Sequence, residues 1–94
     1  MAVELDEDYV EARANLGCVL AETGQLELAV AAFQGALCYH SDYPDVHYHL
    51  ARTLDDLGQH KEAEQHWHEF LLLAPSSPWS DEARTRLEDG AEGA

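Results

Sequence analysis

The chain has 94 residues, with 19 Asp and Glu against 5 Lys and Arg, so its formal net charge is −14. A negative field of this size repels phosphate backbones, which argues against nucleic acid as a partner and favours cationic partners, although acidity can also serve solubility alone. No apolar run is long enough to cross a membrane and the acidic amino terminus does not resemble a signal peptide, so the sequence predicts a cytoplasmic protein with no membrane partner.

The first nine residues are in phase with the end of a helix expected later in the chain. Ala2, Val3, Leu5 and Asp6 correspond to Ala36, Leu37, Tyr39 and His40. We therefore interpret residues 1–9 as the remnant of a preceding repeat, and Met1 as a start added to an excised segment. A natural protein with a short amino-terminal cap is the alternative interpretation.

Residues 10–43 predict a pair of helices, and residues 44–77 predict the same pair again. The expected helices cover residues 9–22 and 26–40 in the first unit and residues 44–57 and 60–73 in the second. Glycine lies in the turn of each pair, at Gly24 and Gly58, where it ends a helix at little cost.

The two units match residue by residue at a spacing of 34. Leu16, Leu20, Gly24, Gln25, Ala29, Phe33 and Leu37 recur as Leu50, Leu54, Gly58, Gln59, Ala63, Trp67 and Leu71. A period of this length indicates a solenoid, in which each unit buries its apolar face against the next and the protein presents a surface. We expect Phe33 and Trp67 to be core residues wedged between the paired helices.

Residues 78–89 predict a capping helix. Ser77 is a good N-cap residue before Pro78 at the first helical position, and acidic residues follow in the first turn, where the helix dipole favours them. Ala83 and Leu87 form a thin apolar stripe, as expected of a terminal helix with a polar outer face. Residues 90–94 have no large apolar side chain and predict a disordered tail or a cut linker.

The repeated pattern resembles the tetratricopeptide repeat. The residues that carry the resemblance are Leu16, Gly17, Leu20, Gly24, Ala29, Phe33 and Ala36, and then Leu50, Ala51, Leu54, Gly58, Ala63, Trp67 and Pro75. The departures are Arg13 and His47 where the family often has tryptophan, Ser41 for the first closing proline, and Phe70 for alanine. The resemblance implies an all-α, right-handed α-solenoid of helix-turn-helix repeats with a C-terminal capping helix, acting as a scaffold or adaptor for other proteins.

In this family the first helices of successive repeats line a concave groove that holds a peptide or a partner's helix. The resemblance implies these groove residues: Glu11, Ala14, Asn15, Cys18, Ala21, Glu22, Asp45, Tyr48, His49, Arg52, Asp55 and Asp56, with Trp79, Glu82 and Arg86 extending the wall. Aromatic residues and arginine dominate interface energies, so the strongest candidates are Tyr48, His49, Arg52 and Trp79. The alternative is that each is an ordinary helix surface residue.

The groove chemistry indicates a basic or amphipathic peptide as the partner. Some family members hold the carboxylate tail of heat-shock chaperones with lysine, asparagine and arginine, but the matching positions here are Ala14, Cys18 and His49. The alternative function is a structural spacer or a self-association module. In that case a homo-oligomer would form through the truncated amino-terminal edge, around Ala12, Leu16 and Val19.

Nothing in the sequence indicates an enzyme or a cofactor. It contains no glycine-rich phosphate loop, no nucleophile motif and no His-Glu-x-x-His. His60, Glu64 and His68 share one helix face, but no third histidine or cysteine ligand is fixed nearby, so we expect no metal site. Cys18 and Cys38 fall on different helices and are interpreted as small packing residues in a reducing compartment.

Overall fold

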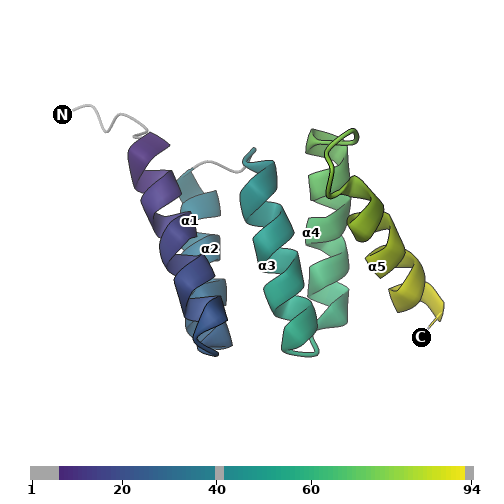
Figure 1. Ribbon diagram of the computed structural model, residues 1–94, viewed down its shortest axis with the longest axis horizontal. Helices are drawn as coiled ribbons and strands as arrows, with labels where there is room; N and C mark the ends of the chain where they lie inside the picture. The colour runs from purple at the N-terminus through teal and green to yellow at the C-terminus, as the bar shows by residue number, and fades with distance from the viewer. Residues whose placement is uncertain (1–6, 40–41, 93–94) are drawn as a thin grey trace.

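Five α-helices follow one another in the computed structural model, which describes residues 7–39 and 42–92 (Figure 1). They are α1 (Glu7–Glu22), α2 (Leu26–Tyr39), α3 (Pro44–Asp56), α4 (His60–Leu73) and α5 (Ser80–Glu92). No strand occurs among the described residues. The all-α fold predicted from the sequence is confirmed.

Several boundaries differ from the predicted ones. Residues 7–9, assigned above to a preceding repeat, belong to α1, and residues 1–6 lie outside the described part of the chain. α3 ends at Asp56, one residue early. Residues 90–92 continue α5 and are not a tail. Residues 93–94 are outside the described part.

The start of α5 also corrects the predicted cap. The helix begins at Ser80 and not at Pro78. The Ser77 hydroxyl accepts a hydrogen bond from the Trp79 amide (3.2 Å), and the Ser77 carbonyl accepts one from the Ser80 amide (3.0 Å). Ser77 therefore closes a turn before the helix. The acidic residues Asp81 and Glu82 do lie in the first turn of α5.

The two helix pairs end their first helices in the same way. Gly24 and Gly58 both have φ of +83°. In each turn the residue after the glycine donates a backbone hydrogen bond of 2.8 Å to a carbonyl five residues back, from Gln25 to Leu20 and from Gln59 to Leu54. A side chain is strained at that φ, so glycine is required there, and the shared geometry makes each pair antiparallel.

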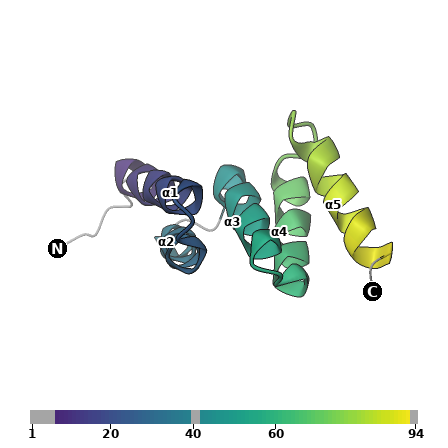
Figure 2. The ribbon, with the colours of Figure 1, turned by 60° about the horizontal axis from the view of Figure 1, so that its bottom comes forward.

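The core lies between paired helices, and the helices stack in chain order. Phe33 and Trp67 are fully buried, as expected from their place in each unit. Figures 1 and 2 show α3 between α2 and α4, with α5 covering the other side of α4. One period after the buried residues Leu50, Ala51 and Leu54 come Arg84, Thr85 and Glu88, all exposed. The corresponding face of α5 is therefore polar.

Gly17 marks the closest approach within the first pair and leads to a stability prediction. A Cβ on Gly17 would lie 2.6 Å from the Phe33 ring. We expect Gly17→Ala to lower the free energy of unfolding by about 1 kcal/mol, because overpacking outweighs the helix propensity gained. Gly35→Ala is the control, since its Cβ would meet only the end of the Arg13 side chain at 3.2 Å. Urea unfolding that ranks Gly17→Ala as the more stable variant would contradict the packing.

Candidate partner-binding groove

Two hollows between α1 and α3 form one surface groove. The larger, about 280 Å³, is lined by Cys18, Ala21, Glu22, Phe33, His49, Arg52, Thr53 and Asp56. The smaller, about 200 Å³, is lined by Val10, Glu11, Ala14, Asn15, Cys18, Tyr43, Asp45, Val46 and His49. Because Cys18 and His49 line both, the hollows are continuous. We call these residues together the α1–α3 groove.

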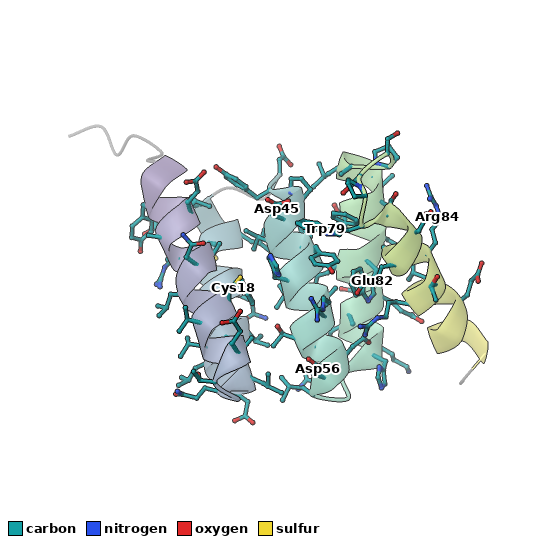
Figure 3. All side chains as sticks on the ribbon, viewed as in Figure 1. Cys18, Asp45, Asp56, Trp79, Glu82 and Arg84 are labelled. Carbon is teal, nitrogen blue, oxygen red and sulfur yellow. The ribbon has the colours of Figure 1, made fainter. Side chains whose placement is uncertain are left out.

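The repeat period explains why these side chains meet. On α1 the lining positions recur every three or four residues, which places them on one helical face. Matching positions on α3 lie 34 residues later, so Glu11 pairs with Asp45, and Glu22 with Asp56. Figure 3 shows Asp45 and Asp56 at opposite ends of α3, with Cys18 facing the middle.

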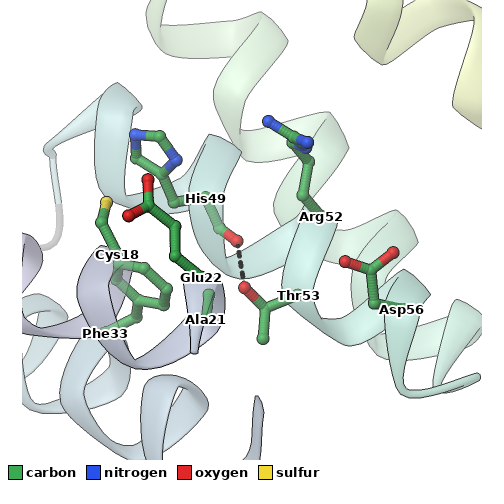
Figure 4. Close-up of a pocket in the computed structure, with 8 residues that line it drawn as sticks. All are labelled: Cys18, Ala21, Glu22, Phe33, His49, Arg52, Thr53 and Asp56. Carbon is green, nitrogen blue, oxygen red and sulfur yellow. Dashed lines mark hydrogen bonds between the residues drawn. The ribbon is translucent and has the colours of Figure 1, made fainter. Parts of the chain in front are cut away.

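The floor of the groove is closely packed. The Phe33 ring of α2 is buried and stacks with the His49 imidazole at a centroid distance of 5.9 Å. The Thr53 hydroxyl donates to the His49 carbonyl at 2.8 Å, so it is used within α3 (Figure 4). The polar character of the groove therefore comes from its rim.

Four exposed carboxylates on that rim surround a partly buried middle. Burial raises the pKa of the Cys18 thiol, and the nearby Glu22 carboxylate raises it further. Burial lowers the pKa of His49, although Asp45 opposes this shift. Both groups are therefore neutral near pH 7. Arg52 is the one cation lining either hollow.

Ten of the fifteen predicted groove residues line these hollows. They are Glu11, Ala14, Asn15, Cys18, Ala21, Glu22, Asp45, His49, Arg52 and Asp56. The predicted residues Tyr48, Asp55, Trp79, Glu82 and Arg86 do not line them. The sequence reasoning did not include Val10, Phe33, Tyr43, Val46 and Thr53. Of these, Phe33 was predicted as a core residue, and it is both buried and part of the lining of the larger hollow.

Comparison with known proteins identifies the family of this arrangement. Residues 20–79, more than half of the chain, match the family model described as Tetratricopeptide repeat. The chain belongs to the tetratricopeptide-repeat family. No curated protein matches it.

Tyr48 joins the second tetratricopeptide repeat to α5 and does not line the two hollows. It is buried, stacks on Trp79 at a centroid distance of 4.6 Å, and donates a hydrogen bond of 2.8 Å to Glu82. Burial, followed by that hydrogen bond, raises the pKa of the phenol. Trp79 is 40% exposed and covers the tyrosine. These contacts place both side chains in the packing of α3 against the start of α5, and their predicted role in partner contact stays a prediction.

Asp55 is also structural, in contrast to its neighbour Asp56. Its carboxylate accepts hydrogen bonds from Trp67 Nε1 (2.9 Å) and Arg86 (3.4 Å), and lies 2.8 Å from His60 Nδ1. Its side chain is only 13% exposed. Asp55 thus joins α3, α4 and α5, because all its oxygens are occupied by groups of the second repeat and the capping helix. Arg86 serves the same junction.

The described residues contain no group of three or more His, Cys, Asp or Glu side chains placed to hold a metal ion. His60 is hydrogen-bonded to Asp55, while Glu64 and His68 remain on the surface of α4. Both cysteines are free thiols. None of the helices in the described part is long and apolar enough to cross a membrane.

A histidine pair in the second repeat predicts loss of stability in mild acid. His47 Nδ1 and His66 Nδ1 lie 3.0 Å apart, with His47 buried. Burial and then His47 lower the pKa of His66, while Glu69 opposes them. In the unfolded chain this histidine therefore binds a proton near pH 6.5, whereas in the folded chain it binds one only at lower pH. The free energy of unfolding is accordingly highest above about pH 6.5 and decreases below it.

This pH dependence is tested by unfolding the protein in urea between about pH 5 and 7.5. We expect the slope of stability against pH to flatten in His66→Gln. His68→Gln, which changes an exposed histidine two residues away, should keep the slope of the wild type. Equal slopes in wild type and His66→Gln would show that the pair does not control the response.

Proposed function

We propose that this chain is a protein-interaction module whose α1–α3 groove holds a basic peptide segment of a partner. Membership of the tetratricopeptide-repeat family supports a protein partner in general. The observation that carries the proposal is the set of exposed rim carboxylates, Glu11, Glu22, Asp45 and Asp56, around the groove. A binding role fits this surface better than catalysis, and a cytoplasmic location stays a prediction.

The charge of the rim is available for a partner. Within residues 7–39 and 42–92, every ion pair found involves other carboxylates: Asp55, Asp81 and Glu82. The four rim carboxylates form none of these ion pairs, and Arg52 is the cation that lines the larger hollow beside Glu22 and Asp56. Exposed interactions of these carboxylates with an incoming cation contribute about 1 kcal/mol each in water and weaken with salt, so the affinity should fall as ionic strength rises.

The test is binding to an array of short peptides graded in net charge. We expect selective binding of lysine- or arginine-containing peptides, reduced about tenfold in Glu22→Gln/Asp56→Asn because two attractive charges are lost. The matched control is Glu62→Gln/Glu69→Gln, which changes the net charge equally but on the outer surface of α4. If the control weakens binding as much, the attraction belongs to the whole molecule and the groove proposal fails.

A second candidate function is self-association through the outer face of α1, with a second copy of the chain as occupant. Leu16 and Val19 are 49% and 54% exposed, whereas the matching Leu50 and Thr53 are 0% and 4% exposed. Ala12 is exposed beside them. In α3 these positions are buried within the stack. The same face of α1 is open, and its apolar side chains favour burial against a like face.

Sedimentation at several concentrations tests this candidate. Because each copy carries a charge of −14, association should strengthen as salt screens the repulsion, the opposite of peptide binding. We expect Val19→Asp to remain monomeric and Arg52→Glu to behave as the wild type. A wild type that stays monomeric in high salt would contradict self-association.

A further inference from the structure

The groove carries two separate pairs of carboxylates. Glu11 and Asp45 line the smaller hollow, and Glu22 and Asp56 line the larger one. Along each helix the two acids are eleven residues apart by number. At a rise of about 1.5 Å per residue, the backbone positions of the two pairs therefore lie about 16 Å apart along the groove.

The surface between the two pairs is small and neutral. Ala14, Ala21 and the Cys18 thiol come from α1, and the neutral His49 imidazole comes from α3. Arg52 lies nearer the Glu22–Asp56 pair, but its guanidinium also lies over the Tyr48 ring and 3.9 Å from Glu82 of α5. The middle of the groove thus offers neither a carboxylate nor a deep apolar socket.

We propose that the occupant is an extended segment with two cationic side chains four or six residues apart, one for each carboxylate pair, and small neutral residues between them. This inference rests on the proposed groove function and specifies its ligand. Extended chain rises about 3.3 Å per residue, so 16 Å corresponds to about five residues. Even separations place both side chains on the groove side, since successive side chains alternate.

The dimensions of the hollows favour an extended segment over a helix. Their volumes of about 280 and 200 Å³ lie below the range of about 300–1,000 Å³ that holds drug-sized ligands, so each suits a single side chain. A helix is about 10 Å wide and would need cations about eleven residues apart to reach both pairs. The distance between the two carboxylate pairs thus selects the spacing of the two cations in an extended chain.

Two peptide isomers test the spacing without changing composition or charge. One is Lys-Ala-Ala-Ala-Ala-Ala-Lys, and the other places both lysines together at the amino end, with both peptides acetylated and amidated. Affinities are measured by calorimetry at low salt. We expect the separated isomer to bind the wild type about tenfold more tightly, because its second contact is intramolecular.

Variants at either end complete the test. Glu11→Gln/Asp45→Asn and Glu22→Gln/Asp56→Asn should each lower the affinity of the separated isomer to that of the adjacent isomer. All four positions are exposed, and circular dichroism checks that the variants fold. If both isomers bound equally and these variants lowered both affinities, the proposed spacing would be overturned while the groove function would stand. Binding that is absent, or unchanged by both variants, would overturn the groove function as well.

Discussion

Trp67→Ala is expected to lower the free energy of unfolding by about 3–5 kcal/mol, a large part of the stability of a small domain. Trp67 is 1% exposed, is among the largest fully buried side chains, and sits in edge contact with Tyr48 at a centroid distance of 5.6 Å. Its removal leaves a cavity between α3 and α4 that the surrounding helices fill only in part. Urea unfolding followed by circular dichroism measures the loss.

The second tryptophan of the chain is the natural control. Trp79 is 40% exposed and stacks on Tyr48 from outside. Trp79→Ala should cost about 1 kcal/mol, the contribution of one aromatic pair. If both tryptophan variants lost equal stability, Trp67 would not be the centre of the second repeat.

Asp55→Ala is expected to cost about 2–4 kcal/mol, and Asp56→Ala less than about 0.5 kcal/mol. The first change leaves the Trp67 indole N–H buried without its acceptor and removes one of the two carboxylate partners of Arg86, the other being Glu82. The second removes an exposed carboxylate of the groove. The effects on peptide binding should be reversed. Asp56→Ala should weaken the binding of basic peptides, whereas Asp55→Ala should leave the affinity of the folded protein for these peptides unchanged.

The two repeats themselves indicate how to separate the contributions at Asp55. One period earlier, Ala21 stands at the position of Asp55 and Phe33 at that of Trp67. The carboxylate is thus present in the repeat whose aromatic residue has an N–H to satisfy. In a Trp67→Phe background, Asp55→Ala should therefore cost less than in the wild type. Additive losses in this double-mutant cycle would show that the hydrogen bond contributes little.

The fold was predictable because two copies of one pattern constrain it. Gly24 and Gly58 mark the two turns, and Phe33 and Trp67 mark the two cores. Because the same residue types recur at a fixed spacing in both units, the prediction did not depend on the weak secondary-structure preferences of single residues. The ends had no second copy to compare. There the predicted start at Pro78 was wrong, because the Ser77 turn depends on hydrogen bonds that local sequence preference does not specify.

The site was predictable in part, for a related reason. Positions such as Glu11 and Asp45 face the groove because helical periodicity repeats in both units. Tyr48 and Asp55 occupy positions implied by the same family pattern. Their side chains instead form hydrogen bonds with Glu82 and Arg86 of α5, at the junction of α3 with α5. Those contacts depend on how α5 packs, which the repeat pattern does not contain.

The most direct test of the central claim is to map the peptide contact by nuclear magnetic resonance. Isotope-labelled protein is titrated with the separated two-lysine peptide, and amide shifts are followed residue by residue. We predict the largest shifts at groove positions such as Cys18, Ala21 and His49, with α5 little affected. Shifts concentrated around Leu16 and Val19, or spread over the whole acidic surface, would contradict a peptide-binding groove between α1 and α3.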